Sequence, residues 1–472
     1  MAQSTAATTK TTLRFNVTRR APELIPPAEP TPYEFKELSD IDDQEGLRFQ
    51  IPVIQFYRNM DDHSGGSVLK GRDPARVIKE AVAKALVSYY PFAGRLREKA
   101  GRKLVVECNG KGIMFIEAEA DVSLEDFGEA LQPPFPCLEE LLFDVPSSTT
   151  VLDSPLILIQ VTRLKCGGFI LALRLNHTMA DAPGLVQFMN AVAELARGAQ
   201  SPSIQPVWER HLLSARNPPR VTCEHREYEE IADTKGTIIP LDDMVHKSFF
   251  FGPTEIAALR RFIPQHLKSS TFEILTACLW RCRTIALQPD PEEIVRIMCI
   301  VNARSLFNPS LPSGFYGNAF AFPIALSTAG KLATNPIGYA LGLIKKTKSD
   351  VTQEYMASLA DLMVLKGRPH FTVVRTFVVS DVTRAGFADL DYGWGPPAYG
   401  GPAKGGVGAI PGVASFYIPF KNGNGDKGIV VPLCLPGNAM EIFVKELNKL
   451  LYEVSENQVA SSESSYFIPS SL

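Results

Sequence analysis

LRLNHTMADAPG, residues 173–184, is the stretch of sequence that decides how this chain folds. It continues a short aliphatic run, 168–175, that glycine flanks and that predicts a buried strand. The run after it, 185–196, places apolar side chains at helical spacing. Asp181 is typical of the residue that precedes a helix. His177 therefore lies where a strand ends and the turn to a helix begins, an edge at which α/β proteins commonly bind ligands.

His177 and Asp181 are four residues apart, and the pair admits more than one interpretation. A free imidazole has a pKa of about 6.5 and can act as a general base near neutral pH. A nearby carboxylate could orient that imidazole, or could order the loop that carries it. The same pair is typical of a structural histidine followed by a helix-capping aspartate. We expect no metal site, because no His-Glu-x-x-His or Cys-x-x-Cys pattern supplies further ligands.

A second motif, DYGWG at residues 391–395, contains one of only three tryptophans in the chain. Its two glycines permit tight backbone geometry and the close approach of neighbouring chain segments. Further distinctive segments are YPFAGR at 90–95, NAR at 302–304 and GFYGN at 314–318.

These motifs, in this order, resemble those of the plant BAHD acyl-CoA-dependent acyltransferases. That family combines His-x-x-x-Asp with a late pentad that usually has Phe at the position of Tyr392, and it usually has Asp at the position of Asn302. The resemblance extends from about residue 12 to residue 455. Within the family the chain is most similar to alcohol acyltransferases that form volatile esters, including the benzyl alcohol benzoyltransferases. The segments that carry this similarity are LSDIDDQ at 38–44, LRFQIP at 47–52 and VSDVTRAGF at 379–387.

The resemblance implies an α/β fold of two chloramphenicol acetyltransferase-like domains, each a mixed sheet with flanking helices. A long crossover joins the two domains, and the active site lies in a channel between them. The residues also indicate a linker, because Pro202, Pro206, Pro218 and Pro219 interrupt any long element. The expected parts are an N-terminal domain at 1–198 to which 389–415 returns, a crossover at 199–240, a C-terminal domain at 241–388 and 416–458, and a disordered tail at 459–472.

Three local patterns give predictions that can be compared directly with a structure. Residues 13–18 alternate apolar and polar side chains and predict a strand. Residues 371–380 are rich in β-branched and aromatic side chains and predict another strand. Glu224, Glu227, Glu229 and Glu230 predict a solvated acidic face.

The resemblance assigns roles to several residues of the site. His177 is expected to be the general base. Arg304 is expected to pair with Asp181, which gives Asp181 a structural role. A mainly structural role is also expected for the pentad residues Asp391, Gly393, Trp394 and Gly395.

Coenzyme A contacts are expected near Ser269, Ser270 and Thr271, because the family places pantetheine and phosphate contacts at this turn. The same residues, with Glu273 close behind, match a helix-capping signature. A helix N-terminus with hydroxyl groups suits an anion. The capping role and the coenzyme A role both stay open.

Composition limits the partners and the cellular compartment. The 472 residues carry a net charge of −3 without a basic tract, so nucleic acid is not an expected partner. No apolar run approaches the ~20 residues needed to span a bilayer, so no membrane association is expected. Eight scattered cysteines predict free thiols in a reducing compartment. We expect a cytoplasmic monomer; the C-terminal Ser470–Leu472 resembles a peroxisomal signal but lacks its basic residue.

The expected function is that of an acyl-CoA:alcohol O-acyltransferase that forms esters by direct transfer, with acyl-CoA as a co-substrate and no cofactor. The resemblance implies benzyl alcohol or small aliphatic alcohols as acceptors, and benzoyl-, acetyl- or short-chain acyl-CoA as donors. Three alternatives stay open. They are a transferase for a larger specialised-metabolite hydroxyl, a catalytically silent acyl-CoA-binding relative, and a hydrolase on the same scaffold.

Overall fold

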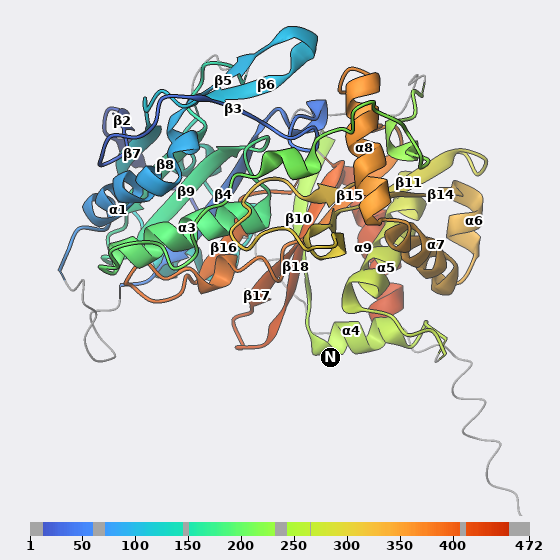
Figure 1. The fold of residues 1–472 in the computed structure, drawn as a ribbon. Coiled ribbons are helices and arrows are strands. Elements are labelled where there is room, and N and C mark those ends of the chain that lie inside the picture. The colour runs from blue at the N-terminus through green and yellow to red at the C-terminus, as the bar shows by residue number, and fades with distance from the viewer. Residues whose placement is uncertain are drawn as a thin grey trace, which may run out of the picture.

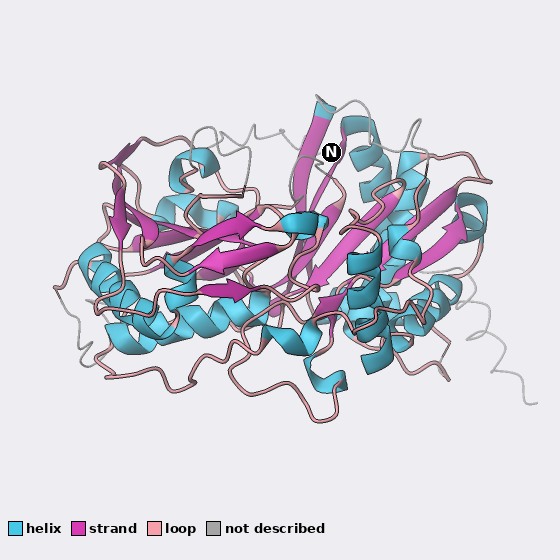
Figure 2. Cartoon of the chain, turned by 45° about the horizontal axis from the view of Figure 1, so that its top comes forward, coloured by secondary structure: helices cyan, strands magenta, loops and turns pink. Residues whose placement is uncertain are grey.

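The computed structural model describes residues 13–59, 71–144, 151–231, 243–264, 266–405 and 412–452. In this part of the chain the strands form two large mixed sheets with helices packed against each (Figures 1 and 2). The α/β fold with two sheet-rich units that the sequence predicts is therefore confirmed. The predicted disordered tail and the C-terminal tripeptide lie outside the described residues.

The first sheet has the strand order β1-β7-β8-β9-β4-β16 within the described residues, and β2 also pairs with β7. Neighbouring strands are antiparallel except β7 and β8, which are parallel. The strands are β1 (Val17–Arg19), β2 (Glu23–Ile25), β4 (Gln50–Tyr57), β7 (Ile113–Ala120), β8 (Ile157–Arg163), β9 (Phe169–Asn176) and β16 (Tyr399–Pro402).

β9 is the strand that leads into His177, and all eight of its residues are buried. It is paired by β8 and β4 and is therefore an interior strand of the sheet, as expected for a buried strand. Two helices, α1 (Pro74–Ser88) and α3 (Ala182–Ala196), lie side by side across one face of this sheet (Figure 1). α3 begins at Asp181, whose side chain accepts a hydrogen bond from the backbone N–H of Gly184. The strand, turn and helix predicted around His177 are confirmed.

The second sheet has the order β10-β18-β17-β15-β11-β14 in the described residues. β15 is parallel to both β11 and β17, and the other pairs are antiparallel. The strands are β10 (Met244–Phe251), β11 (Ile294–Cys299), β14 (Ile324–Thr328), β15 (Thr376–Asp381), β17 (Ala414–Lys421) and β18 (Lys427–Pro436). The helices of this half are α4 (Pro253–Arg260), α5 (Thr271–Leu287), α6 (Ala329–Thr334), α7 (Ile337–Ser349), α8 (Gln353–Leu365) and α9 (Gly437–Tyr452).

The core of the second half centres on α5, which packs against α7 and α9. Eleven of its residues are buried, including the large side chain of Trp280. Smaller elements complete the fold. They are a sheet with the order β3-β6-β5, a two-stranded pair β12-β13 and the short helix α2. Their bounds are β3 (Phe35–Glu37), β5 (Arg95–Glu98), β6 (Leu104–Glu107), β12 (Val301–Asn302), β13 (Phe320–Ala321) and α2 (Leu138–Leu141).

One late segment belongs to the first sheet. β16 (Tyr399–Pro402) pairs with β4, whereas β15 before it and β17 after it belong to the second sheet. The chain therefore crosses between the sheets twice in this region. On this basis we propose the domain division given by the sequence, with 389–415 counted with the N-terminal domain.

The crossover contacts both halves of the molecule. Arg210 forms a buried ion pair of 2.7 Å with Asp42 of the first half, and Arg216 forms an ion pair of 2.7 Å with the buried Asp361 of α8 in the second half. The prediction of a solvated acidic face is wrong for Glu227. Its buried carboxylate contacts the imidazole of His225 at 3.1 Å and accepts a hydrogen bond from the hydroxyl of Tyr355. Hydrogen-bond partners brought by α8 make this burial possible.

Two predicted strands begin later than expected. The strand predicted at 13–18 covers only Val17–Arg19, because Asn16 instead donates from its backbone and side chain to the Asp121 carboxylate. The strand predicted at 371–380 begins at Thr376. Arg375 just before it has φ of 51°, a left-handed conformation that breaks the extended chain.

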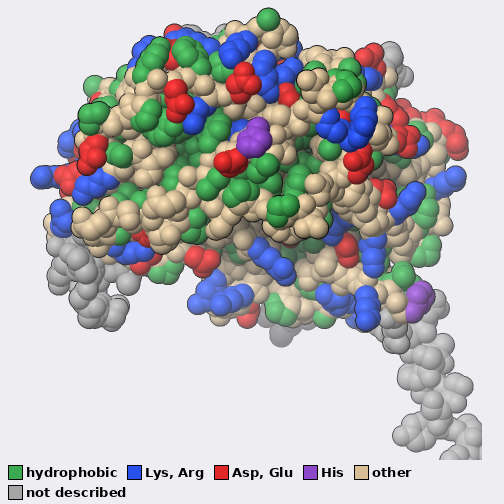
Figure 3. Space-filling view, viewed as in Figure 1, with side chains coloured by type: hydrophobic (Ala, Val, Ile, Leu, Met, Phe, Trp, Pro, Cys, Tyr) green, Lys and Arg blue, Asp and Glu red, His purple; other side chains and the backbone are tan. Residues whose placement is uncertain are grey.

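The surface mixes charges of both signs. On the face in Figure 3, basic and acidic side chains are interspersed, and no large patch of one sign is visible. Within the described residues, none of the helices has the length and apolar character needed to cross a membrane.

Gly184 in the first turn of α3 gives a test of how closely the two halves approach. A Cβ added there would lie 2.2 Å from the backbone oxygen of Tyr316, a group that cannot rotate away. Gly184→Ala should therefore lower stability by about 1–3 kcal/mol, the usual range for overpacking, and lower the Tm in a thermal scan.

Gly342→Ala is the matched control, because a Cβ at this α7 position meets no atom within 4 Å. Alanine favours helix over glycine by up to about 1 kcal/mol, so this variant should keep or raise the Tm. Equal Tm values for the two variants would contradict the close approach at Gly184.

Candidate active site

A cavity of about 560 Å³ lies between the two sheet-bearing halves, and His177 and Asp181 line it. The first half also contributes Phe49 from the segment before β4, and the second half contributes Phe320 and Ser380 among others. Most of the lining is apolar, so a substrate in this cavity loses most of its contact with water.

His177 is held at its backbone on both sides. Its N–H donates to the carbonyl oxygen of Phe49 at 2.9 Å, and its carbonyl oxygen accepts from the amide nitrogen of Asn318 at 2.8 Å. The imidazole lies between the rings of Phe49 and Phe320, with centroid distances of 5.5 and 5.9 Å. The backbone bonds and the flanking rings together fix the position of the imidazole in the cavity.

The surroundings of His177 keep its imidazole neutral near pH 7. Burial lowers the pKa of His177 below its ordinary value of 6.5, because an imidazolium loses solvation inside the protein. The carbonyl oxygens of His177 itself and Ala180, together with Asp181 and Asn318, raise it, but burial outweighs them. A neutral imidazole is the form that can accept a proton.

Asp181 is fully occupied by structural contacts. Arg304 donates two hydrogen bonds of 2.7 Å to the two carboxylate oxygens of Asp181, and a third of 2.7 Å to the carbonyl oxygen of Gly317. The same carboxylate accepts from the backbone N–H of Gly184 and of Ala319, each at 3.1 Å. The structure thus brings together Asp181 and Arg304, two residues that are 123 positions apart.

The pentad lies outside the cavity and shapes a turn. One carboxylate oxygen of Asp391 accepts from the backbone N–H of Gly393 at 2.7 Å and of Gly395 at 2.8 Å. Both glycines have positive φ, 111° and 79°. The buried Trp394 contacts the ring of Phe169 in β9 at 5.2 Å. None of these pentad residues lines the cavity. The turn instead packs against β9, the strand that leads into His177, through the contact between Trp394 and Phe169.

Ser269, Ser270 and Thr271 lie at the N-terminus of α5, and none of them lines the cavity. The capping signature is confirmed: Ser270 accepts from the backbone N–H of Glu273 at 3.3 Å, and Glu273 accepts from the backbone N–H of Ser270 at 2.9 Å. The hydroxyl of Thr271 accepts a hydrogen bond of 3.4 Å from Arg260. The expected coenzyme A contacts stay a prediction.

Sequence reasoning missed three residues that hold the turn after β9. Asn318, which ends GFYGN, bonds to the carbonyl oxygen of His177. Arg210 of the crossover donates to the carbonyl oxygen of Met179 at 2.8 Å, and Asp42 contacts both Asn318 and Arg210. Asn318 and Asp42 lie in the distinctive segments GFYGN and LSDIDDQ, and this position was their only local signal. Arg210 gave none, because its ion-pair partner Asp42 lies 168 residues away.

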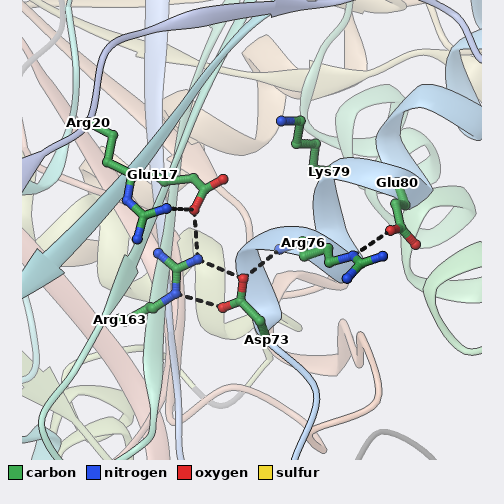
Figure 4. Close-up of a pocket in the computed structure, with 7 residues that line it drawn as sticks. All are labelled: Arg20, Asp73, Arg76, Lys79, Glu80, Glu117 and Arg163. Carbon is green, nitrogen blue, oxygen red and sulfur yellow. Dashed lines mark hydrogen bonds and ion pairs between the residues drawn. The ribbon is translucent and has the colours of Figure 1, made fainter.

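A second hollow, of about 620 Å³, lies at the outer edge of the first half, and Figure 4 shows its seven charged residues. Arg163 pairs with Asp73 at 2.6 Å and with Glu117 at 2.7 Å, and Arg76 pairs with Glu80 at 2.9 Å. Because these charges mostly neutralise one another, we assign no site to this hollow. Among the described residues, no group of three His, Cys, Asp or Glu side chains could hold a metal ion.

A model of the Transferase family matches residues 15–450, nearly the whole chain. This chain belongs to the BAHD family of acyl-CoA-dependent acyltransferases. It is 74% identical over 440 residues to benzyl alcohol O-benzoyltransferase of Nicotiana tabacum, covering 93% of this chain and 94% of that protein. It is 54% identical over 450 residues to alcohol acyl transferase 1, allele GSa, of Malus domestica, covering 94% and 96%.

Among solved structures, vinorine synthase matches with a TM-score of 0.70 at 23% identity, covering 92% of this chain and 98% of that one. This match shows the fold. The family, the fold class and the type of activity predicted from the sequence are thus confirmed. The BAHD enzyme is an acyl-CoA:alcohol O-acyltransferase that forms esters.

The contacts of Asp181 predict a stability phenotype. Asp181→Ala leaves the partly buried Arg304 without its partner and removes a helix cap, so it should cost about 3–5 kcal/mol of stability. The expected readout is a lower Tm and a lower soluble yield. Asp181→Asn keeps the oxygen that caps α3 but loses the charge, so its Tm should lie between those of Asp181→Ala and the wild type. Loss of activity in Asp181→Ala at an unchanged Tm would contradict the structural role.

Proposed function

We propose that this BAHD acyltransferase joins benzyl alcohol to the benzoyl group of benzoyl-CoA, with His177 as the general base. The observation that carries the proposal is the apolar, ring-lined cavity around the imidazole. The benzyl alcohol O-benzoyltransferase of Nicotiana tabacum, whose name states these two groups, supports the same choice.

A row of rings extends from His177 along one wall of the cavity. The ring of Phe320 lies 4.9 Å from that of Phe322, which lies 5.2 Å from that of Phe371. Aromatic rings prefer edge-to-face or offset contacts at such distances, and each contact contributes about 0.5–1.5 kcal/mol beyond burial. Two aromatic substrate groups can therefore gain contacts on this wall that an aliphatic chain does not make.

The reaction follows from the position of the neutral imidazole. His177 accepts the hydroxyl proton as the alcohol oxygen attacks the thioester carbonyl, which forms a tetrahedral intermediate. When that intermediate collapses, the carbon–sulfur bond breaks and the coenzyme A thiolate takes the proton from His177. Ester and thiol are the products. The transfer is direct, and it needs neither a covalent acyl-enzyme nor a cofactor.

Coenzyme A is proposed to reach the cavity from the side of α5, where Ser269, Ser270 and Thr271 contact its pantetheine or phosphate groups. The support is the 17-residue helix that begins at Thr271, since the backbone N–H groups of a helix N-terminus favour anions. Pentad residues Asp391 to Gly395 have a supporting role only.

The enzyme is further proposed to act as a cytoplasmic monomer without a nucleic-acid or membrane partner. All eight cysteines are free thiols, which suits a reducing compartment.

A second candidate function is the transfer of acetyl or short acyl groups to aliphatic alcohols. The identity of 54% to the Malus domestica alcohol acyl transferase favours it. A cavity of about 560 Å³ has room for either pair of groups, so products decide between the two.

Removal of the base gives the first test. His177→Ala should lower kcat by about 10²–10⁴-fold, the usual contribution of a positioned base, while the Tm stays close to that of the wild type. In the wild type, kcat/KM should fall as the pH drops through the pKa of His177, because protonation removes the base. Burial lowers this pKa, so the midpoint should lie below 6.5. A folded His177→Ala variant with a near-normal rate would refute the assignment.

A competition assay tests the substrates. Purified enzyme receives acetyl-, butanoyl-, hexanoyl- and benzoyl-CoA together with methanol, butanol, hexanol and benzyl alcohol, and mass spectrometry identifies the esters. Benzyl benzoate should dominate. A spread of short esters would support the second candidate, free acid regardless of alcohol would indicate a hydrolase, and no product would indicate a silent relative.

The same assay can test the wall of rings. A Cβ at Gly46 would lie 2.4 Å from the ring of Phe371, so Gly46→Ala should push that ring from its place. The ratio of benzyl benzoate to hexyl acetate should then fall by about tenfold, as for other changes in pocket shape. Gly342→Ala, remote from the cavity, should keep the wild-type ratio.

A further inference from the structure

We propose that Asn318 is a positioning residue for His177, and that the buried ion pair of Asp42 and Arg210 fixes the direction in which the Asn318 amide points. The inference rests on the proposed role of His177 as the base. It explains how this imidazole presents the correct nitrogen to the alcohol, although the carboxylate of Asp181 is committed to Arg304.

The amide of Asn318 has only one possible orientation. Its side chain is fully buried, and its Nδ2 donates to a carboxylate oxygen of Asp42 at 2.9 Å and to the carbonyl oxygen of His177 at 2.8 Å. Both acceptors lack hydrogens, so the oxygen of the amide could not replace its nitrogen there. The backbone N–H of Asn318 also donates to Asp42, at 2.9 Å. The remaining atom, Oδ1, is thereby fixed on the other side of the amide.

Two buried polar atoms near this amide lack a hydrogen-bond partner within the described part of the chain. One is Oδ1 of Asn318 and the other is Nδ1 of His177. The side chain of Asn318 is joined to His177 through its hydrogen bond to the His177 carbonyl oxygen, which brings these two atoms into the same region of the site. Buried polar groups are rarely left unpaired. The simplest pairing has a protonated Nδ1 that donates toward Oδ1, or toward the His177 carbonyl that Asn318 also holds.

This pairing determines the tautomer of the base. With the proton on Nδ1, the lone pair of the neutral imidazole is on Nε2. Nε2 is then the atom that takes the proton from the alcohol. Asn318 thus orients the ring as the aspartate of a Ser-His-Asp triad does, but without a charge. A neutral partner suits a buried base, because a carboxylate in this place would raise the pKa of His177.

Asp42 and Arg210 keep Asn318 in place. Both side chains are buried, and their ion pair is 2.7 Å long. Arg210 also donates to the carbonyl oxygen of Met179 at 2.8 Å, and its guanidinium stacks on the ring of Trp208 at 4.4 Å. The second carboxylate oxygen of Asp42 accepts from the hydroxyl of Ser39 at 2.6 Å. The network therefore holds the loop of His177 at two carbonyl oxygens, with its charges balanced.

The charged groups near His177 are few, which makes a pH profile informative. Asp181 faces it from the start of α3, and Arg304 neutralises that carboxylate. The other charged or titratable side chains that line the cavity within the described residues are Glu45, Arg48, His370, Asp381 and Arg384.

The test compares Asn318→Ala, Asn318→Asp and Ser358→Ala, with His177→Ala in the same series. Asn318→Ala should lower kcat by about 10- to 100-fold, the effect of a misplaced catalytic group, with both KM values within about twofold of the wild type. Asn318→Asp places a carboxylate beside the imidazole, so the acid limb of kcat/KM should move to higher pH. If repulsion from Asp42 prevents folding, the double variant Asn318→Asp with Asp42→Asn restores a donor opposite the new carboxylate.

Ser358→Ala is the control for loss of buried hydrogen bonds alone. Ser358 is fully buried and remote from the cavity. Its hydroxyl accepts from the backbone N–H of Thr222 and of Cys223 and also contacts Nε2 of His225 at 2.9 Å. Its Tm should fall while kcat and the acid limb stay at wild-type values. A lower Tm with unchanged kcat in Asn318→Ala, or an unmoved acid limb in the folded aspartate variants, would overturn the proposal. A near-normal rate for His177→Ala would instead overturn the role of the base itself.

Discussion

The ion pair between Asp181 and Arg304 is the interaction on which the rest of the site depends. It joins the start of α3 to a segment 123 residues later, and the same carboxylate and guanidinium bond three further backbone groups, those of Gly184, Gly317 and Ala319. Because the pair fixes the turn after β9 against the second half, it also fixes one wall of the cavity. A carboxylate committed in this way cannot serve His177 as a proton partner, so other groups must orient the imidazole.

That commitment has a chemical benefit. Burial lowers the pKa of His177, and a free carboxylate beside it would act in the opposite direction. Because Arg304 neutralises Asp181, burial is the stronger effect, and it favours the neutral, basic form of the imidazole. In the proposed reaction, the mostly apolar lining of the cavity favours transfer of the acyl group to the alcohol over hydrolysis. The pairing of Asp181 with Arg304 therefore both stabilises the site and limits the effect of the carboxylate on the pKa of His177.

Local patterns predicted local structure well. The residues from 168 to 196 change once from a strand pattern to a helix pattern. This change is clear enough to place His177 at the end of β9 and Asp181 at the start of α3. The strand predicted at 13–18 was wrong at its start, because the alternation of apolar and polar residues begins before the residues that pair with β7. Asn16 donates to the side chain of Asp121 instead. The acidic run near 227 failed because charge alone does not reveal a buried partner. Tyr355 and His225 supply that partner for Glu227 only in the folded chain.

The sequence by itself determined the family, the two-sheet α/β fold and the identity of His177, Asp181 and Arg304 as residues of interest, because these depend on short motifs in a fixed order. Only the tertiary structure decided which groups meet. Asp42, Arg210 and Asn318 come from three distant segments and converge on the carbonyl oxygens after β9. The ring row of Phe320, Phe322 and Phe371 likewise forms across a long separation in the chain. Periodicity reports which face of an element is buried, whereas a site depends on which buried faces pack together.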